Sequence, residues 1–229
     1  MVSWPMSQSG KGPLGSMARL SRDEITDMER RLAEWQTPAE MAALVEDAMH
    51  RLGSEDLFNQ GGLAFIRDAW IAGEFGNKRR AEQVRLVADE WPDFELMKDG
   101  QIEPFEAVEA DDPERRRGDE YRNTTGEIED DPVEDWIARA EQASAWLEAA
   151  CQKKADKHYG ARANLVAYLS FTEYGIRQKE VEKCLVSVTE AVKDSFDTVW
   201  VLWKKRAYLV WKGGEANPKG TRLQNPLEQ

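Results

Sequence analysis

Aromatic and basic side chains alternate near the C-terminal end of the chain, and they are the residues best suited to recognition chemistry. The aromatic quartet comprises Trp200, Trp203, Tyr208 and Trp211. The basic cluster comprises Lys204, Lys205, Arg206 and Lys212. Large aromatic rings anchor protein interfaces, and they also stack on nucleic-acid bases while cations contact the phosphates. This region therefore predicts binding to another protein or to a nucleic acid.

The other polar patterns predict no catalysis. Glu46 and His50 lie one helical turn apart and could share a metal ion, but the sequence lacks a second pair of ligands that would complete such a site. A nucleophile beside its base, a glycine-rich phosphate loop and paired metal-binding motifs are all missing at the required spacings. The sequence thus predicts a protein that is not an enzyme and that uses no metal ion or cofactor.

The charge of the chain is distributed unevenly. Residues 1–151 contain 17 Lys and Arg against 34 Asp and Glu, whereas residues 152–229 contain 14 against 9. An acidic half favours a protein partner with a basic surface, and such complementarity raises the association rate at low salt. The sequence contains no apolar run of the ~20 residues that a membrane-spanning helix needs. We expect a cytoplasmic protein that does not enter a membrane.

Helical signals dominate the N-terminal half. Ser or Thr three residues before Glu opens the expected helices 21–35 and 37–52. Apolar spacing then predicts a helix over 63–72 and another from Asn77 that ends at Pro92. The Asp-Gly pair within 94–105 predicts a small two-stranded ribbon.

The C-terminal half is expected to contain three helices and a hairpin. An acidic stretch with few large apolar residues, 106–131, predicts a flexible linker. Apolar spacing predicts helices over 132–157, 161–174 and 176–194. The β-branched and aromatic run 198–211 then predicts an antiparallel hairpin whose tip is the basic cluster.

These elements predict a mainly α (α+β) fold in two parts. Residues 1–20 are interpreted as vector-derived or disordered, 21–105 as an acidic helical domain and 106–131 as the linker. Residues 132–213 are interpreted as a helical domain with the β-hairpin, and 214–229 as a tail. With 229 residues, two small domains lie within the usual range of domain sizes.

The expected function follows from the two apolar faces of the hairpin. A helical layer covers one face, so the other must meet further helices, a partner or a ligand. We expect a non-enzymatic regulatory or assembly adaptor that forms homo-oligomers through the aromatic quartet. One alternative is a winged-helix nucleic-acid-binding domain in which the basic cluster contacts phosphates. Another is an acidic half that mimics a nucleic acid.

Overall fold

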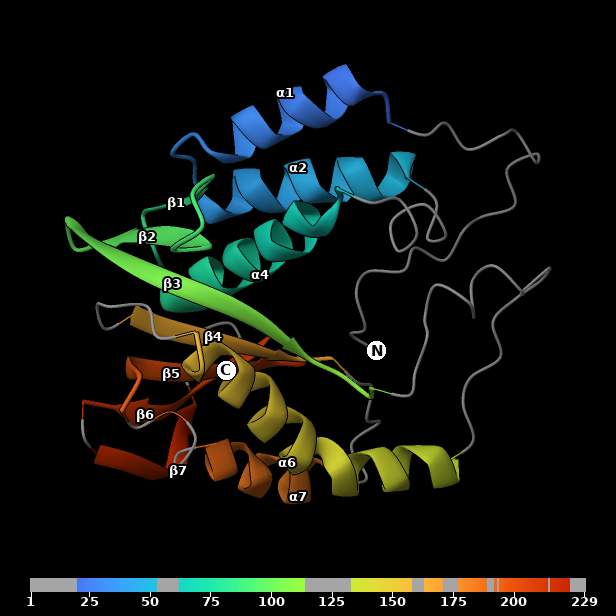
Figure 1. The fold of residues 1–229 in the computed structure, drawn as a ribbon, viewed down its shortest axis with the longest axis vertical. Coiled ribbons are helices and arrows are strands. Elements are labelled where there is room, and N and C mark those ends of the chain that lie inside the picture. The colour runs from blue at the N-terminus through green and yellow to red at the C-terminus, as the bar shows by residue number, and fades with distance from the viewer. Residues whose placement is uncertain are drawn as a thin grey trace, which may run out of the picture.

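The computed structural model describes residues 20–52, 62–113, 133–157, 163–170, 177–188, 192, 194–213 and 215–222. They form three layers, in which a mixed β-sheet lies between two sets of helices (Figure 1). The helices are α1 (Arg22–Leu32), α2 (Pro38–Arg51), α4 (Ala64–Arg79), α6 (Val133–Ala155), α7 (Gln178–Cys184) and the 3-10 helix η1 (Leu185–Val188). The strands are β1 (Gln83–Leu86), β2 (Phe94–Lys98), β3 (Gln101–Ala110), β4 (Ala163–Leu169), β5 (Phe196–Trp203), β6 (Arg206–Lys212) and β7 (Glu215–Arg222).

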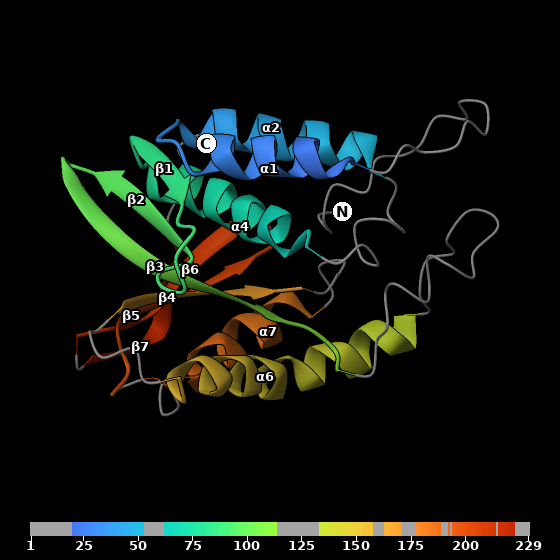
Figure 2. The ribbon, with the colours of Figure 1, turned by 45° about the horizontal axis from the view of Figure 1, so that its top comes forward.

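The sheet follows chain order from β1 to β7. Strands β3, β4 and β5 are parallel to one another, and the pairs on either side of them are antiparallel. Helix α6 connects β3 to β4, while α7 and η1 connect β4 to β5. Two successive right-handed crossovers in the same direction bring their helices to one face of the sheet. Figure 2 shows α6 and α7 together on that face, with α1, α2 and α4 on the other.

Each face of the sheet has its own hydrophobic core. One core joins α1, α2 and α4 to the sheet, and the other joins α6, α7 and η1 to it. Helices α2 and α4 approach closely at Gly76, where a Cβ atom would lie 3.1 Å from Cγ of Pro38. A side chain at position 76 would therefore press on the Pro38 ring, which would have to shift by a few tenths of an ångström.

The predicted starts of the first two helices are confirmed. The Ser21 hydroxyl accepts a hydrogen bond from the Glu24 backbone N–H, and the Glu24 carboxylate accepts one from the Ser21 backbone N–H. Thr37 and Glu40 form the same reciprocal pair at α2. The hydrogen bond from the Ser21 backbone is the main reason why the pKa of Glu24 falls to about 2.

The mainly α fold with a three-helix C-terminal domain is wrong, because several segments predicted as helix are strand. Residues 163–169, placed within a predicted helix, form β4, and 83–86 form β1. A strand buried on both faces has a continuous apolar sequence, which periodicity alone does not distinguish from a buried helix. The helix predicted over 176–194 is broken, since α7 ends at Cys184 and η1 follows.

The predicted linker also requires correction. Its first residues, 106–110, are the second half of β3, which pairs in parallel with β4. Strands from both predicted domains therefore share one sheet. Residues 114–131 of the predicted linker lie outside the described residues. In the predicted tail, 214–229, residues 215–222 form β7, while 214 and 223–229 lie outside the described residues.

Both predicted hairpins are present. The β2–β3 turn contains Asp99 and Gly100 at positive φ, and the β5–β6 turn contains Lys204 and Lys205 at positive φ. Strands β5 and β6 are not an isolated ribbon, however, because β4 and β7 pair with their outer edges. None of the described helices is long and apolar enough to cross a lipid bilayer.

Candidate functional site

A cavity opens beside the C-terminal half of β3, where β2 no longer pairs with it. Strand β2 pairs with β3 only as far as Phe105, whereas β4 pairs with β3 from Phe105 to Ala110. Beyond the Phe94–Phe105 pair, where β2 begins, the backbone N–H of Ala107 donates to Asp93 Oδ2 at 2.7 Å instead of to a strand. The cavity, of about 530 Å³, is lined by residues of α4, β3, α6 and the segment before β2. Helices from both layers therefore reach the same site.

Asp93 and Lys154 line this cavity, and Glu106 lies buried behind Lys154, outside the lining. We call these three side chains the charged triad: Asp93, Glu106 and Lys154. The Lys154 ammonium lies 2.8 Å from Asp93 Oδ2 and 2.5 Å from Glu106 Oε2. Glu106 is only 1% exposed, while the Lys154 side chain is 13% exposed. Asp93 immediately precedes β2, Glu106 lies on β3, and Lys154 lies in the last turn of α6. The sheet register and the α6 crossover thus bring together residues from three separate segments.

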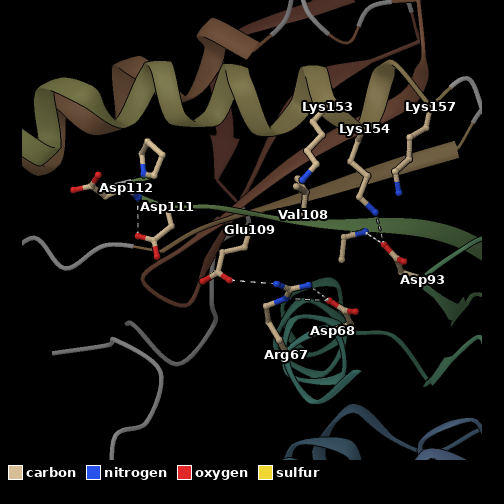
Figure 3. A pocket seen from close by; sticks show the side chains of 12 residues that line it. Arg67, Asp68, Asp93, Val108, Glu109, Asp111, Asp112, Lys153, Lys154 and Lys157 are labelled. Atoms are coloured by element: carbon tan, nitrogen blue, oxygen red, sulfur yellow. Dashed lines mark hydrogen bonds and ion pairs between the residues drawn. The ribbon is translucent and has the colours of Figure 1, made fainter. Parts of the chain in front are cut away.

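The triad keeps its lysine charged. Burial lowers the pKa of Lys154, but the nearby carboxylates of Asp93 and Glu106 outweigh that effect and raise it above its ordinary value. An ammonium between two carboxylates is therefore present at neutral pH. Its positive charge is directed towards the cavity base, as Figure 3 shows for Lys154 and Asp93.

A second charged group lies on the α4 side of the cavity. Arg67 and Asp68 are neighbours on α4, and Glu109 reaches them from β3 (Figure 3). Arg67 donates to Asp68 Oδ1 from Nε at 3.3 Å and from Nη2 at 3.2 Å. Burial is the main cause that raises the pKa of Asp68, and the charge of Asp93 raises it further. This second group is thus electrically coupled to the triad.

Charged residues of opposite sign flank the cavity at its rim. Lys153 and Lys157, one helical turn apart around the end of α6, are exposed and line one side. Asp111 and Asp112 line the part that follows the end of β3. Figure 3 shows the lysines on the side of α6, separated from Arg67 and Asp68 by β3. A ligand with anionic groups would therefore meet cations from two layers.

The aromatic quartet lies in the interior. Trp200, Trp203, Tyr208 and Trp211 are 4%, 0%, 3% and 5% exposed. Trp200 belongs to the core under α4, where the Arg79 guanidinium stacks over its ring at 4.7 Å. The other three belong to the core under α6, because the two layers of helices cover both faces of the hairpin. The quartet therefore presents no aromatic face to a partner, which removes the physical basis of the predicted adaptor surface.

The basic cluster lies apart from the cavity, since none of its members is among the cavity-lining residues. Lys204 lies 4.9 Å from the centroid of the Trp203 ring, and Arg206 Nη1 is 3.6 Å from Glu182 Oε1. Lys205 and Lys212 are exposed. The winged-helix arrangement is not formed, because 163–169 is a strand of the central sheet. Phosphate binding by this cluster stays a prediction.

The weak metal pattern is a surface feature. His50 Nε2 lies 3.8 Å from Glu46 Oε1, and both side chains are more than half exposed. Across the described part of the chain, no group of three or more His, Cys, Asp and Glu side chains is arranged to hold a metal ion. A cation in the cavity would thus have to draw part of its coordination from water or a ligand.

The sequence interpretation missed the charged triad because its members are far apart along the chain. Lys154 is 61 residues from Asp93 and 48 from Glu106. One local signal was available: Glu106 follows Phe105 within a run that can form a strand, and a carboxylate buried in a strand needs a charged partner. The assignment of 106–131 to a linker concealed this signal.

Comparisons with protein-family models, with characterised proteins and with solved structures gave no match to this chain. The function must therefore be inferred from the chemistry of the cavity. The lining combines the cations of Arg67, Lys153, Lys154 and Lys157 with five carboxylates. Cations, and metal ions held by carboxylates, stabilise the charge of a transferring phosphoryl group, so this combination is suited to phosphate esters.

Proposed function

We propose that the protein is a hydrolase that cleaves phosphodiester bonds of nucleic acid with a divalent cation held by Asp93 and Glu106. The observation that carries the proposal is the ion pair of Asp93 and Lys154 in the lining of a cavity, with the carboxylate of Glu106 buried behind the lysine. A buried ion pair adds little net stability, because the loss of hydration offsets the attraction between the charges. Strongly coupled charges within a cavity are instead typical of functional sites.

The two carboxylates suit magnesium. Mg²⁺ is commonly held by one or two protein carboxylates and completes its octahedral shell with waters and substrate phosphate oxygens. Asp93 and Glu106 offer two carboxylates from adjacent chain segments, and the third ligand group absent from the described residues would come from the substrate. A cation bound in this way would lower the pKa of a water nucleophile and stabilise the charge on the phosphate.

Lys154 contributes a fixed positive charge. Its ammonium contacts Asp93 Oδ2 and Glu106 Oε2, so a divalent cation would share these two carboxylates with it. A preorganised cation stabilises negative charge that develops in the transition state without reorganising at that moment. Lys154 thus supports the charge separation that hydrolysis requires.

The two lysines at the rim favour a polymeric substrate. Lys153 and Lys157 are exposed on the α6 side, where they can contact phosphates beyond the one being cleaved. Contacts with the phosphate backbone position a nucleic acid without reading its sequence. The formal charge of the chain is -12, so these local cations must act against general repulsion. Binding should accordingly depend strongly on salt and on divalent ions.

The test is cleavage of end-labelled oligonucleotides by the full chain. Single- and double-stranded DNA and RNA are each incubated with Mg²⁺ or Mn²⁺, and a chelator should stop the cleavage. Asp93→Asn and Glu106→Gln should lower the rate by at least about 100-fold, the size of effect seen when a key charge-stabilising group is removed. Glu95→Gln is the matched control, because Glu95 forms its ion pair with Arg85 on the sheet and not with Lys154.

Two results would contradict the proposal. One is the absence of cleavage of every substrate class with either cation. The other is cleavage that Asp93→Asn and Glu106→Gln leave at the rate of the Glu95→Gln control, since an activity independent of the triad would come from a contaminant or another site.

A further inference from the structure

We propose that Arg67 binds a phosphate of the substrate next to the one that is cleaved, and that Asp68 and Glu109 orient it for this contact. The inference rests on the proposed function, because it assigns a binding residue to the same site. It is carried by the position of Arg67, by the unused hydrogen-bonding capacity of its guanidinium and by the two carboxylates that hold it.

Arg67 lies on the wall of the cavity opposite the lysines. It projects from α4, while Lys153 and Lys154 project from α6 and Lys157 from the turn after it, and β3 passes between them (Figure 3). An extended anionic strand in the cavity therefore has cations on both sides. Because a strand rises about 3.3 Å per residue, Glu109 lies roughly 10 Å along β3 from Glu106. Arg67 faces Glu109, so it is placed next to the charged triad along β3 and does not contact it.

The guanidinium retains free donors. An arginine carries five N–H groups. Among the described residues, Arg67 uses Nε and Nη2 in hydrogen bonds to Asp68 Oδ1, at 3.3 and 3.2 Å. Its Nη1 lies 3.6 Å from Glu109 Oε2, beyond hydrogen-bond distance. The end of the guanidinium formed by Nη1 and Nη2 therefore keeps donors that match a pair of phosphate oxygens.

A purely structural role explains this arrangement less well. The Arg67 side chain is 40% exposed, and ion pairs at such exposure add little to stability. Asp68 and Glu109 are less exposed, at 23% and 20%, so the carboxylates are the fixed parts and the arginine is the accessible part. Asp68 on one edge and Glu109 near the other restrict the guanidinium to one orientation. They act as positioning residues for a phosphate contact.

Methylphosphonate substitution tests the contact directly. A set of oligonucleotides carries one uncharged methylphosphonate each, moved one linkage at a time away from the cleaved bond. The wild-type chain should lose at least about fivefold in kcat/KM when the linkage contacted by Arg67 is neutral. Arg67→Ala should lose a similar factor on the unmodified oligonucleotide, mainly through KM, and should show no further loss at that one linkage.

Two further variants separate charge from geometry. Arg67→Lys keeps the charge but not the planar fork, so it should recover only part of the lost kcat/KM. Arg30→Ala is the matched control, because Arg30 is an exposed arginine on α1 that pairs with Asp27 and Glu34. It should retain the wild-type response at every linkage.

The possible results separate the role of Arg67 from the proposed hydrolase function. If the wild-type chain cleaves and Arg67→Ala keeps the full methylphosphonate response, the role of Arg67 is refuted while the proposed function stands. Arg67→Ala could instead lower kcat/KM and still lose as much as the wild-type chain at every methylphosphonate linkage. The arginine would then act only through the fold or through the overall electrostatic potential, and the inference would also fail. If the wild-type chain cleaves nothing, both fail.

Discussion

Replacing Lys154 with methionine should destabilise the protein by about 3 kcal/mol at neutral pH. The change keeps the length of the side chain but removes the cation that lies 2.5 Å from Glu106 Oε2 and 2.8 Å from Asp93 Oδ2. Removal of one partner from a buried ion pair costs roughly 3–5 kcal/mol. The low end applies because Asp93 is 25% exposed, so water can still hydrate its carboxylate. For a chain of this size the loss corresponds to a fall in Tm of roughly 6–12 °C.

Urea unfolding followed by circular dichroism measures this loss, with Lys153→Met as the matched control. Lys153 is the exposed neighbour on the same helix, so its replacement should change the free energy of unfolding by less than about 0.5 kcal/mol. In a Glu106→Gln background, Lys154→Met should cost at least about 1 kcal/mol less, since the buried negative charge is then absent. Equal costs in both backgrounds, or a Lys154→Met variant as stable as Lys153→Met, would refute the coupling within the triad.

Three smaller predictions follow from local structure. Gly76→Ala should destabilise the chain by about 1–3 kcal/mol in thermal unfolding, because its Cβ would press on α2, whereas Gly73→Ala meets nothing nearer than 3.5 Å and should be tolerated. Burial raises the pKa of Cys151 to about 12, so a thiol reagent at pH 8 should modify Cys184 and spare Cys151 until the chain unfolds. The pKa of Glu24 is about 2, below its ordinary 4.5. Its stabilising contribution should therefore be complete above pH 4.5 and be lost as the pH falls towards 2, and Glu24→Gln should remove this part of the pH dependence of urea unfolding.

The sequence predicted those elements whose signals are local. Reciprocal capping by Ser21 and Glu24 and the Asp99-Gly100 turn depend on neighbouring residues, and both are present. Strand β4 was missed because burial on both faces removes the alternation of apolar and polar residues on which recognition of a strand depends. With β4 predicted as a helix, the central strand of the parallel part is missing, so the remaining elements predict no parallel sheet.

The candidate site was beyond prediction for a related reason. Lys154 approaches Glu106 only because β3, α6 and β4 form a crossover that returns α6 over the sheet. Trp200 and Trp203 lie on opposite faces of the same sheet, and both are buried. The sequence indicated that both faces of this hairpin are apolar, but not what packs against them. In the structure the chain's own helices pack against both faces.

The most direct test of the central claim uses an oligonucleotide with a single phosphorothioate at the cleaved bond. If a cation held by Asp93 and Glu106 contacts the phosphate, sulfur should suppress cleavage in Mg²⁺, and the softer ions Mn²⁺ or Cd²⁺ should restore it, because sulfur ligands prefer softer metals. The rescue should occur in the wild-type chain and be lost in Glu106→Gln. Equal cleavage of the sulfur and oxygen substrates in Mg²⁺, or cleavage that persists in a chelator, would contradict it.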